Sequence, residues 1–411
     1  MLKKLFSYKV PRNLLITVNF LGLLLVILYN KTFDKYSLGI AISLIALIYL
    51  SNYFLNKVST GDNYIFLIVS MMMSIGIIMI YRINPILGFK QVIWFGLGTL
   101  ILFVSYFIVK LINNKWSRLM RAYVILSVIL FLFTLIFGST IKGATNWIKI
   151  GQYTFQPAEL IKLVFIFFLA SYYVNRDKFE NKYFVISIAY MNIGFLFIQK
   201  DLGTALLFYL IFVTIFYVYE RDRRFILYNL LGSMIIGIIA YFVFSHVQVR
   251  VDAWLNPWKD ISGKGYQIAQ SLFAIASGGF LGTGIGLGHP EFIPEVQTDF
   301  IFSAICEEMG ILTGIAVIML FLILIYRGIK ITLEQKNPFF KIIALGITTM
   351  FGFQAFIILG GVTKMIPLTG ITLPFLSYGG SSLIASFSAL GILQVSSEYI
   401  PLQKEKEDNN E

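Results

Sequence analysis

The chain has 411 residues, of which 58% are hydrophobic and only 13% are charged. An ordinary soluble domain carries roughly 25% charged residues, so a water-soluble fold could not hide this much apolar surface. The net charge of +12 comes from basic residues scattered over short segments between apolar runs. This pattern suits contact with anionic membrane lipids and lacks the basic stripe or motif of a nucleic-acid-binding protein. The composition therefore predicts an all-α polytopic membrane protein.

The apolar residues form runs of about 17–25, the length that crosses a hydrocarbon core about 30 Å thick. About twelve such runs predict transmembrane helices, near residues 14–30, 36–55, 64–81, 91–110, 120–137, 158–174, 183–198, 202–219, 225–245, 300–326, 341–360 and 379–397. The two runs on either side of residues 199–203 are the hardest to separate. The charges of Lys200 and Asp201 favour a tight turn there over one long helix.

Lysine and arginine in the short connections set the orientation of a membrane protein. The N-terminus carries Lys3 and Lys4, and counting runs from there places the other basic connections and the C-terminal tail on the same side. We therefore expect both termini in the cytoplasm. Three longer segments then face outward, at residues 138–157, 246–300 and 360–378.

Asp299 is the most informative residue of these outer segments. It lies where a polar, glycine-rich stretch gives way to the apolar run at 300–326. An acidic side chain at mid-membrane costs at least about 2.5 kcal/mol unless it reaches water, a partner or a cation. Asp299 is therefore a functional-site hypothesis. The alternative is that Asp299 caps the helix that follows, since Thr298 and Asp299 both suit an N-cap.

The single cysteine, the two histidines and the glycine-rich segment each argue against one kind of functional site. Cys306 is the only cysteine and lies in an apolar run, so it is interpreted as a small buried residue. His246 and His289 are too few and too isolated for a zinc site. No strand precedes the glycines of 282–288, which excludes a dinucleotide-binding loop. We expect those glycines to form a mobile turn or to let the backbone approach a ligand closely.

Three blocks of sequence resemble the SEDS family, the RodA/FtsW-like polymerases of cell-wall peptidoglycan. They occur in the family's order, and the resemblance covers about residues 62–398. The blocks are GATNWI at 143–148 with QPAELIK at 156–162, then QKDLGTA at 199–205, and then GYQIAQS at 265–271, TDFIF at 298–302, EEMG at 307–310 and PLTGITLPFLSYGGSS at 367–382.

The resemblance implies a ten-helix core and an outward-facing glycosyltransferase site. The family polymerises lipid II, a disaccharide-pentapeptide on undecaprenyl pyrophosphate, beside a class B penicillin-binding protein. The division implied here is an extra helix pair at 1–58, a polymerase core at 59–398 with an extracytoplasmic loop at 246–300, and a cytoplasmic tail at 399–411. Motif matching places the family's essential aspartate at Asp299.

Transfer of a glycan from a lipid pyrophosphate needs a base for the attacking hydroxyl and positive charge for the leaving group. We expect Asp299 to be that base. A divalent cation, Mg or Mn, is possible at the pyrophosphate, although no metal site is predicted. The predicted substrate-binding residues are Trp147, Glu159, Lys162, Arg250, Gln270, Lys364 and Ser377.

One departure from the family bears on the charge for the pyrophosphate. Asn146 stands where many members carry arginine. The positive charge is then expected from elsewhere, and the candidates are Lys142, Lys149, Arg250 and Lys364.

Several candidates keep a structural interpretation beside the functional one. Glu159 and Lys162 lie one helical turn apart on the predicted helix. They are interpreted either as a structural ion pair or as a pair that orients the site. Asp201 is interpreted as a surface turn residue, and Trp147 as a substrate contact or an interfacial aromatic. Further structural interpretations are local pairing of Arg250 with Asp252, close helix packing at 377–382, and a structural role for Glu307 or Glu308.

Two other functions fit many apolar helices with a few internal charges. One is transport, as a lipid II flippase or another lipid-linked transporter. The other is a non-catalytic scaffold for a penicillin-binding protein. The clustering of unusual residues in the outer segments and the lack of a visible inverted repeat count against transport, while the scaffold stays an alternative.

Overall fold

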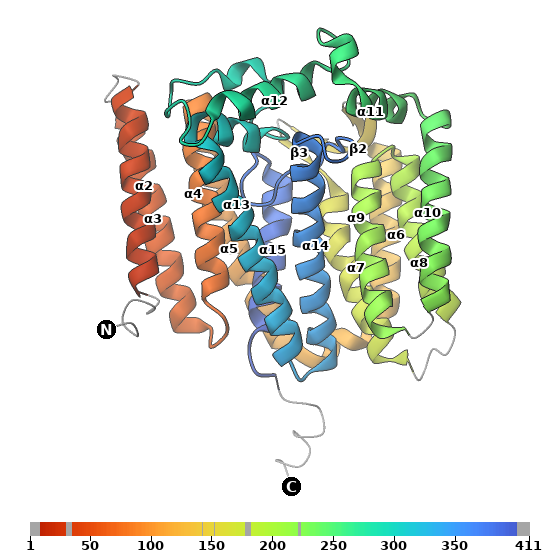
Figure 1. Cartoon of the computed structure of the whole chain (residues 1–411). Coiled ribbons are helices and arrows are strands. Elements are labelled where there is room, and N and C mark those ends of the chain that lie inside the picture. Colours follow the sequence, from red (N-terminus) through yellow and green to blue (C-terminus); the bar gives the residue numbers. More distant parts are fainter. Residues whose placement is uncertain are drawn as a thin grey trace. The chain divides into compact units, whose positions relative to one another are not determined.

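The computed structural model describes residues 9–29, 35–141, 143–151, 153–176, 182–220 and 223–400. Long helices account for most of them (Figure 1). They are α2 (Lys9–Tyr29), α3 (Lys35–Val58), α4 (Tyr64–Ile83), α5 (Pro85–Ile112), α6 (Met120–Phe137), α7 (Pro157–Val174), α8 (Lys182–Ile198), α9 (Leu202–Tyr219), α10 (Arg223–Val243), α13 (Ile301–Glu334), α14 (Pro338–Val362) and α15 (Gly380–Ser396).

Each predicted apolar run falls on one of these helices, which confirms the polytopic α-helical membrane fold. Within the described residues, nine helices are long and apolar enough to cross a membrane, and α8 and α15 are shorter apolar helices. The tight turn predicted between two runs is also confirmed, since α8 ends at Ile198 and α9 begins at Leu202. The number of helices that cross the bilayer stays a prediction.

The chain divides into two compact units that alternate along the sequence. The first unit comprises Met1–Tyr106, Gln270–Arg327 and Thr372–Glu398, and the second comprises Phe107–Ala269, Gly328–Ile371 and Tyr399–Glu411. In the first unit, α2 and α3 pack against each other and against α4. In the second, α7 packs against α6 and α14, and α9 packs against α8 and α14. The predicted division into an extra pair, a core and a tail stays a prediction.

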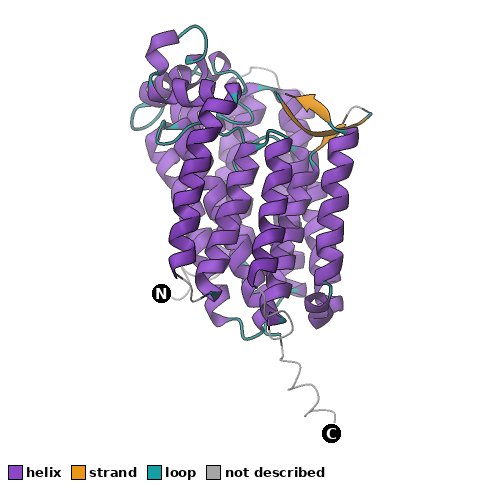
Figure 2. Ribbon diagram, turned by 90° about the vertical axis from the view of Figure 1, so that its right-hand side faces the viewer, coloured by secondary structure: helices purple, strands orange, loops and turns teal. Residues whose placement is uncertain are grey.

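The segment between α6 and α7, predicted to face outward, is not helical. It forms a three-stranded antiparallel sheet in the order β1 (Ser139–Ile141), β2 (Ala144–Ile150), β3 (Tyr153–Phe155), shown in orange in Figure 2. Asn146 and Ile148 on β2 are buried while Lys149 is exposed, the alternation expected of a strand with one covered face. This small sheet is an addition to the α-helical fold that the sequence predicts.

The long outer loop, predicted at 246–300, contains short helices rather than irregular chain. They are α11 (Ser245–Leu255), η3 (Pro257–Asp260), α12 (Tyr266–Gly278) and η4 (Pro290–Phe292). Apolar residues recur at helical spacing over residues 266–275, and this segment lies on α12.

α13 is broken at Gly310, whose φ of 82° and ψ of 166° no helical residue adopts. A break leaves backbone groups without their helical partners. Residues of the glycine-rich loop supply them: Thr283 N donates to Glu307 O at 2.9 Å, and Gly284 N donates to Glu308 O at 3.1 Å. In return, Ile311 N donates to Gly279 O at 3.0 Å and Leu312 N donates to Phe280 O at 3.4 Å.

This pairing explains the run of glycines at 282–288. Gly282 has a φ of +89°, and a Cβ there would lie 2.2 Å from Glu308 O. Only glycine allows both the conformation and this distance. The sequence analysis expected these glycines to let the backbone approach a ligand closely. The close approach at Gly282 is made to the backbone of α13 instead.

Candidate functional site

Asp299 lies in the first unit, in a turn two residues before α13 begins at Ile301. Its side chain is half-buried. The N–H groups of Thr298 and Asp299 each donate to Glu295 O at 3.1 Å. Glu295 has a φ of 59°, a left-handed conformation that is uncommon for a residue with a Cβ. Such strain is retained where the surroundings enforce it, and it clusters at functional sites.

Ser377 packs behind this turn. Its hydroxyl donates to Thr298 O and accepts from Leu373 N at 3.0 Å. Tyr378 N donates to Gln297 O at 2.8 Å, and Gln91 donates from Nε2 to Ser377 O at 3.1 Å. Ser377 is buried, so the structure gives it a role in holding the backbone next to Asp299. Its predicted contact with substrate stays a prediction.

Gln270 is the third predicted residue of the first unit and lies half-buried on α12. The next residue, Ser271, shares a hydrogen bond of 2.7 Å with the hydroxyl of Ser303, in the first turn of α13. α12 thus packs on the segment that follows Asp299, and in Figure 1 it runs across the end of α13.

Arg82 and Glu308 form a buried ion pair in the same unit. Arg82 Nη2 lies 3.0 Å from Glu308 Oε1, with 15% and 0% of the two side chains exposed. The guanidinium also donates to Gly286 O at 3.1 Å and to Gly288 O at 3.2 Å, while Gly286 N donates to Glu308 Oε2 at 2.9 Å. Arg82, at the end of α4, therefore fixes the glycine-rich loop to α13.

Glu307 supports the same loop. One carboxylate oxygen accepts from His289 N at 2.8 Å, and its backbone carbonyl accepts from Thr283. The contacts of Glu307 and Glu308 favour the structural interpretation for both. Sequence reasoning missed Arg82, although an arginine at the end of the apolar run at 64–81 is itself a signal.

In the second unit, Glu159 and Lys162 form the predicted ion pair on α7. Lys162 Nζ lies 2.9 Å from Glu159 Oε2, and both side chains are buried. Lys162 also donates to Gln354 Oε1 on α14 at 3.4 Å. A buried pair with such a partner can hold two helices or orient a ligand, so both interpretations stay open.

Asp201 is not a surface turn residue. It is buried, caps α9 by accepting from Thr204 N at 3.2 Å, and accepts two further bonds at its other oxygen. Asn146 donates from Nδ2 at 2.7 Å and Gln156 from Nε2 at 2.8 Å. Asp201 thereby joins β2, the start of α7 and the start of α9. Asn146, where many family members carry arginine, is here its neutral partner.

Replacing Asp201 with alanine should lower the free energy of unfolding by about 2–3 kcal/mol, because a cap is lost and two buried amides lose their acceptor. Thermal or chemical unfolding of the detergent-purified protein measures this. Thr140→Ala is the control, since it removes an exposed 3.0 Å bond to Thr145 in the same sheet and should change the free energy by under about 0.5 kcal/mol. Equal effects of the two substitutions would contradict the assignment.

Two further predicted cations of the second unit, Arg250 and Lys364, lie on or beside α11. Arg250, on α11, donates to Thr369 O at 2.7 Å, and Trp254 donates from Nε1 to Lys364 O at 3.2 Å. Both bonds fasten α11 to the segment before Ile371. Lys364 has a left-handed φ of 61°. Burial, then the charges of Arg250 and Lys200, hold the pKa of His246 below its usual value, so this imidazole adds no charge near pH 7.

Trp147 and Lys149 lie on β2. Trp147 is half-buried and accepts at its carbonyl from Ser139 Oγ at 3.0 Å, whereas Lys149 is exposed. Lys142 falls outside the described residues. The predicted site residues therefore divide between the units: Asp299, Gln270 and Ser377 in the first, and Trp147, Glu159, Lys162, Arg250 and Lys364 in the second.

Among the residues that the structure describes, no three His, Cys, Asp or Glu side chains come together in a way that could hold a metal ion. Magnesium often binds through one or two carboxylates and substrate phosphates, without a protein cage. A divalent cation carried with a pyrophosphate thus stays a prediction.

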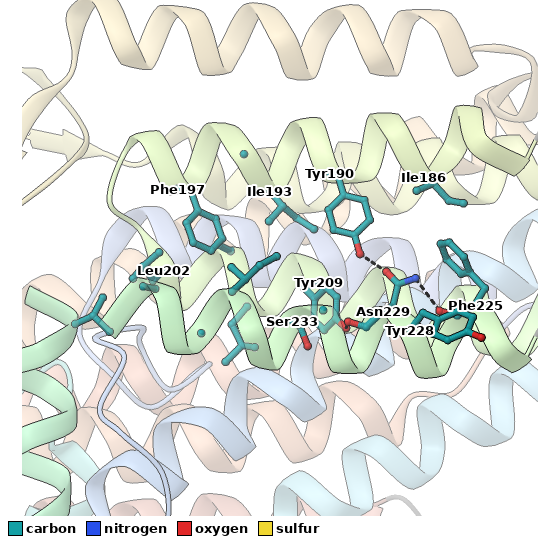
Figure 3. A pocket seen from close by; sticks show the side chains of 18 residues that line it. Ile186, Tyr190, Ile193, Phe197, Leu202, Tyr209, Phe225, Tyr228, Asn229 and Ser233 are labelled. Atoms are coloured by element: carbon teal, nitrogen blue, oxygen red, sulfur yellow. Dashed lines mark hydrogen bonds between the residues drawn. The ribbon is translucent and has the colours of Figure 1, made fainter. Parts of the chain in front are cut away.

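A cavity of about 740 Å³ lies in the second unit between α8, α9 and α10 (Figure 3). Its lining is mainly apolar, with glycines on α8 and α10 that leave room between the helices. Among its polar residues, Asn229 accepts from Tyr190 OH at its side chain and from Tyr209 OH at its carbonyl. Few side chains of α10 are buried, so the cavity borders a helix with little protein cover. A hydrocarbon chain suits such a lining.

Comparison with known proteins identifies the family. The FtsW/RodA/SpoVE family model, described as "Cell cycle protein", matches residues 62–400. The chain is 33% identical over 363 residues to stage V sporulation protein E of Bacillus subtilis, covering 84% of this chain and 98% of that protein.

Two further similarities extend the comparison. The chain is 38% identical over 268 residues to peptidoglycan glycosyltransferase RodA of Mycobacterium tuberculosis, and the match covers 61% of this chain but only 57% of that protein's length. A solved structure described as "Structural coordination of polymerization and crosslinking by a peptidoglycan synthase complex" aligns with a TM-score of 0.68 and 28% identity, over 82% of this chain and 97% of the other. The chain therefore belongs to the FtsW/RodA/SpoVE family.

Proposed function

We propose that the protein is a peptidoglycan glycosyltransferase that polymerises lipid II into glycan strands at the outer face of the bacterial cytoplasmic membrane, with both termini in the cytoplasm. The observation that carries this proposal is the placement of Asp299. Its carboxylate lies in a strained turn that is held by the bonds to Glu295 and by Ser377, at the entrance to a membrane helix. The mycobacterial relative is named for the same activity.

Asp299 acts as the general base. The hydroxyl oxygen of the acceptor sugar attacks the anomeric carbon of the donor, and the bond from that carbon to the pyrophosphate oxygen breaks. The hydroxyl proton passes to Asp299, and undecaprenyl pyrophosphate leaves. A positioned base typically contributes about 10²–10⁴-fold, and the strained turn supplies the positioning.

The departing pyrophosphate also needs positive charge, and the predicted cations for it are Lys162, Arg250 and Lys364. Arg250 and Lys364 belong to the cluster that fastens α11, and Lys162 is the buried cation of α7. Preorganised positive charge at the leaving group is often the larger catalytic contribution. A divalent ion bound with the substrate would share this task.

The cavity between α8, α9 and α10 provides a route for the lipid. Its apolar lining and its volume of about 740 Å³ suit part of a polyprenyl chain. A class B penicillin-binding protein is the proposed partner, and the similar synthase structure, in which polymerization and crosslinking are coordinated, supports it.

Ser377→Ala should lower the polymerisation rate constant about tenfold with a smaller change in KM, because a shift well under 1 Å at a catalytic group is enough for such a loss. The variant loses the hydroxyl that holds Thr298 O next to Asp299. Initial rates at several lipid II concentrations give the two parameters. The matched control is Ser382→Ala, whose hydroxyl pairs with Thr372 at 2.9 Å. Full activity of Ser377→Ala would refute the positioning role.

The proposed function is tested with purified protein, lipid II and a class B partner in detergent and in vesicles. Glycan polymer that depends on Asp299 supports the enzyme. Translocation of lipid II across the vesicle membrane without polymer formation would show that the protein is a flippase and not a polymerase. Binding of lipid II or of the partner, with neither polymerisation nor translocation, would show that the protein is a non-catalytic scaffold.

A further inference from the structure

Two adjacent residues are the most exposed large apolar side chains of residues 270–300, the first unit's part of the long loop. Phe280 is 72% exposed and Leu281 is 81% exposed, directly after α12 ends at Gly278. Neither side chain contributes to the buried core. Adjacent exposed apolar residues of this size mark a surface that contacts something other than water.

The backbone of this loop sets where the two side chains lie. Leu312 N donates to Phe280 O, and Ile311 N donates to Gly279 O, so the turn lies beside α13 just after its break at Gly310. From there α13 carries a stripe of exposed apolar side chains along its length. Leu312 is 47% exposed, Ile315 49%, Met319 49% and Leu322 51%. On a helix that crosses a membrane, this stripe faces lipid, and Phe280 and Leu281 extend it.

The position along α13 also gives a depth. Arg327 marks the charged end of the helix, where it pairs with Asp62 and lies over the ring of Tyr64 at 4.5 Å. At about 1.5 Å per residue, Leu312 lies about 22 Å along the helix from Arg327, inside a hydrocarbon core about 30 Å thick. The turn that is hydrogen-bonded to Leu312 thus reaches the depth of the acyl chains.

Non-helical backbone is tolerated at that depth only where its polar groups find partners in the protein. The broken helix provides them. Thr283 N, Gly284 N, Gly279 O and Phe280 O all pair with backbone groups on the two sides of Gly310. The backbone groups of the turn and those freed by the break therefore hydrogen-bond to each other. The outward surface of the turn is then formed by the apolar side chains of Phe280 and Leu281.

We propose that residues 278–284 form a membrane-inserted turn, in which Phe280 and Leu281 contact the acyl chains of the outer leaflet. The continuity with the lipid-facing stripe of α13 and the depth of the turn both favour lipid as the occupant. The same loop is fixed to α4 through Arg82 and to α13 through Glu308, and α13 begins two residues after Asp299. Insertion thereby sets the depth of Asp299 relative to the lipid surface.

The test measures the environment of each position in a bilayer. Cys306 is the only cysteine, so Cys306→Ala gives a background for single cysteines at 280 and 281, each labelled with a nitroxide in nanodiscs. Power-saturation measurements compare collisions with oxygen, which concentrates in acyl chains, against a water-soluble nickel chelate. Leu322→Cys on the lipid-facing stripe and Lys264→Cys on the exposed loop are the references.

The proposal predicts oxygen-to-nickel ratios at 280 and 281 close to that of position 322 and several-fold above that of position 264. A ratio like that of position 264 would overturn it, since the turn would then lie in water. Low collision rates with both reagents would also overturn it, because another protein surface would then cover the turn. Thermal unfolding of each labelled protein reports whether it is folded.

A second measurement uses the unmodified chain. A photoreactive diazirine in the acyl chains of the vesicle lipids should label the peptide that contains Phe280 and Leu281, alongside the membrane helices. Labelling of the helices without this peptide would contradict the proposal even if a cysteine variant fails to fold.

Discussion

Asp299→Asn should reduce lipid II polymerisation by at least about 10²-fold, because the amide has the shape of the carboxylate but does not accept the proton of the attacking hydroxyl. Of residue 299, the described bond that holds the turn uses the backbone, with Asp299 N donating to Glu295 O, and asparagine keeps that backbone group and a side chain of the same shape. The variant should therefore fold and insert normally. Polymer length and yield on gels, at equal amounts of folded protein, measure the effect.

The matched control for this variant is Glu291→Gln. Glu291 is an exposed carboxylate of the same outer loop, and its partner is His289 at 3.0 Å. Removing its charge should change the polymerisation rate less than about threefold if a positioned base, rather than general negative charge, is what the reaction needs. Similar losses in the two variants would assign the effect to charge. Activity of Asp299→Asn near that of the natural chain would eliminate the base.

Arg82→Met should lower the free energy of unfolding by about 3–5 kcal/mol, the range for breaking a buried ion pair from one side. Glu308, with none of its side chain exposed, would lose its charged partner, and the carbonyls of Gly286 and Gly288 would lose their donor. Denaturant unfolding in detergent, followed by loss of tertiary structure, gives the change.

Two comparisons isolate the ion pair. The double variant Arg82→Met, Glu308→Gln should recover most of the lost stability, since glutamine is neutral and still accepts from Gly286 N. Lys330→Met breaks the exposed pair with Glu334, at 3.7 Å, and should change stability by only about 0–1 kcal/mol. If Arg82→Met resembled Lys330→Met, or if the double variant gained nothing, the pair would not be a structural clamp.

Local patterns in the sequence predict the helices well. Apolar runs of membrane length depend only on neighbouring residues, and each predicted run became a helix. The pairing of Glu159 with Lys162 was predictable for the same reason, since residues three apart share a helix face. The turn between α8 and α9 followed from Lys200 and Asp201.

Features that depend on distant residues were not predictable. Asn146 and Gln156 reach Asp201 across 55 and 45 residues, so Asp201 was taken for a surface residue. The partner of Lys162 on α14, Gln354, lies 192 residues away. The strands β1 and β3 have three residues each, too few for a clear alternation of period two.

The break in α13 is a further example. Gly310 lies inside an apolar run, and glycine is common in membrane helices without breaking them. Only the loop at 279–284, which supplies partners for the freed backbone groups, makes the break favourable. The same loop explains why Arg82 and Glu308 pair, although residues 107–269 of the second unit lie between them in the sequence.

The most direct test of the central claim is a structure of the Asp299→Asn variant with lipid II bound. The account predicts an acceptor sugar hydroxyl within about 2.6–3.2 Å of the side-chain oxygen at position 299, the reach of a general base. A sugar bound elsewhere, or a side chain at position 299 turned into the lipid or closed off from the outer face, would contradict it.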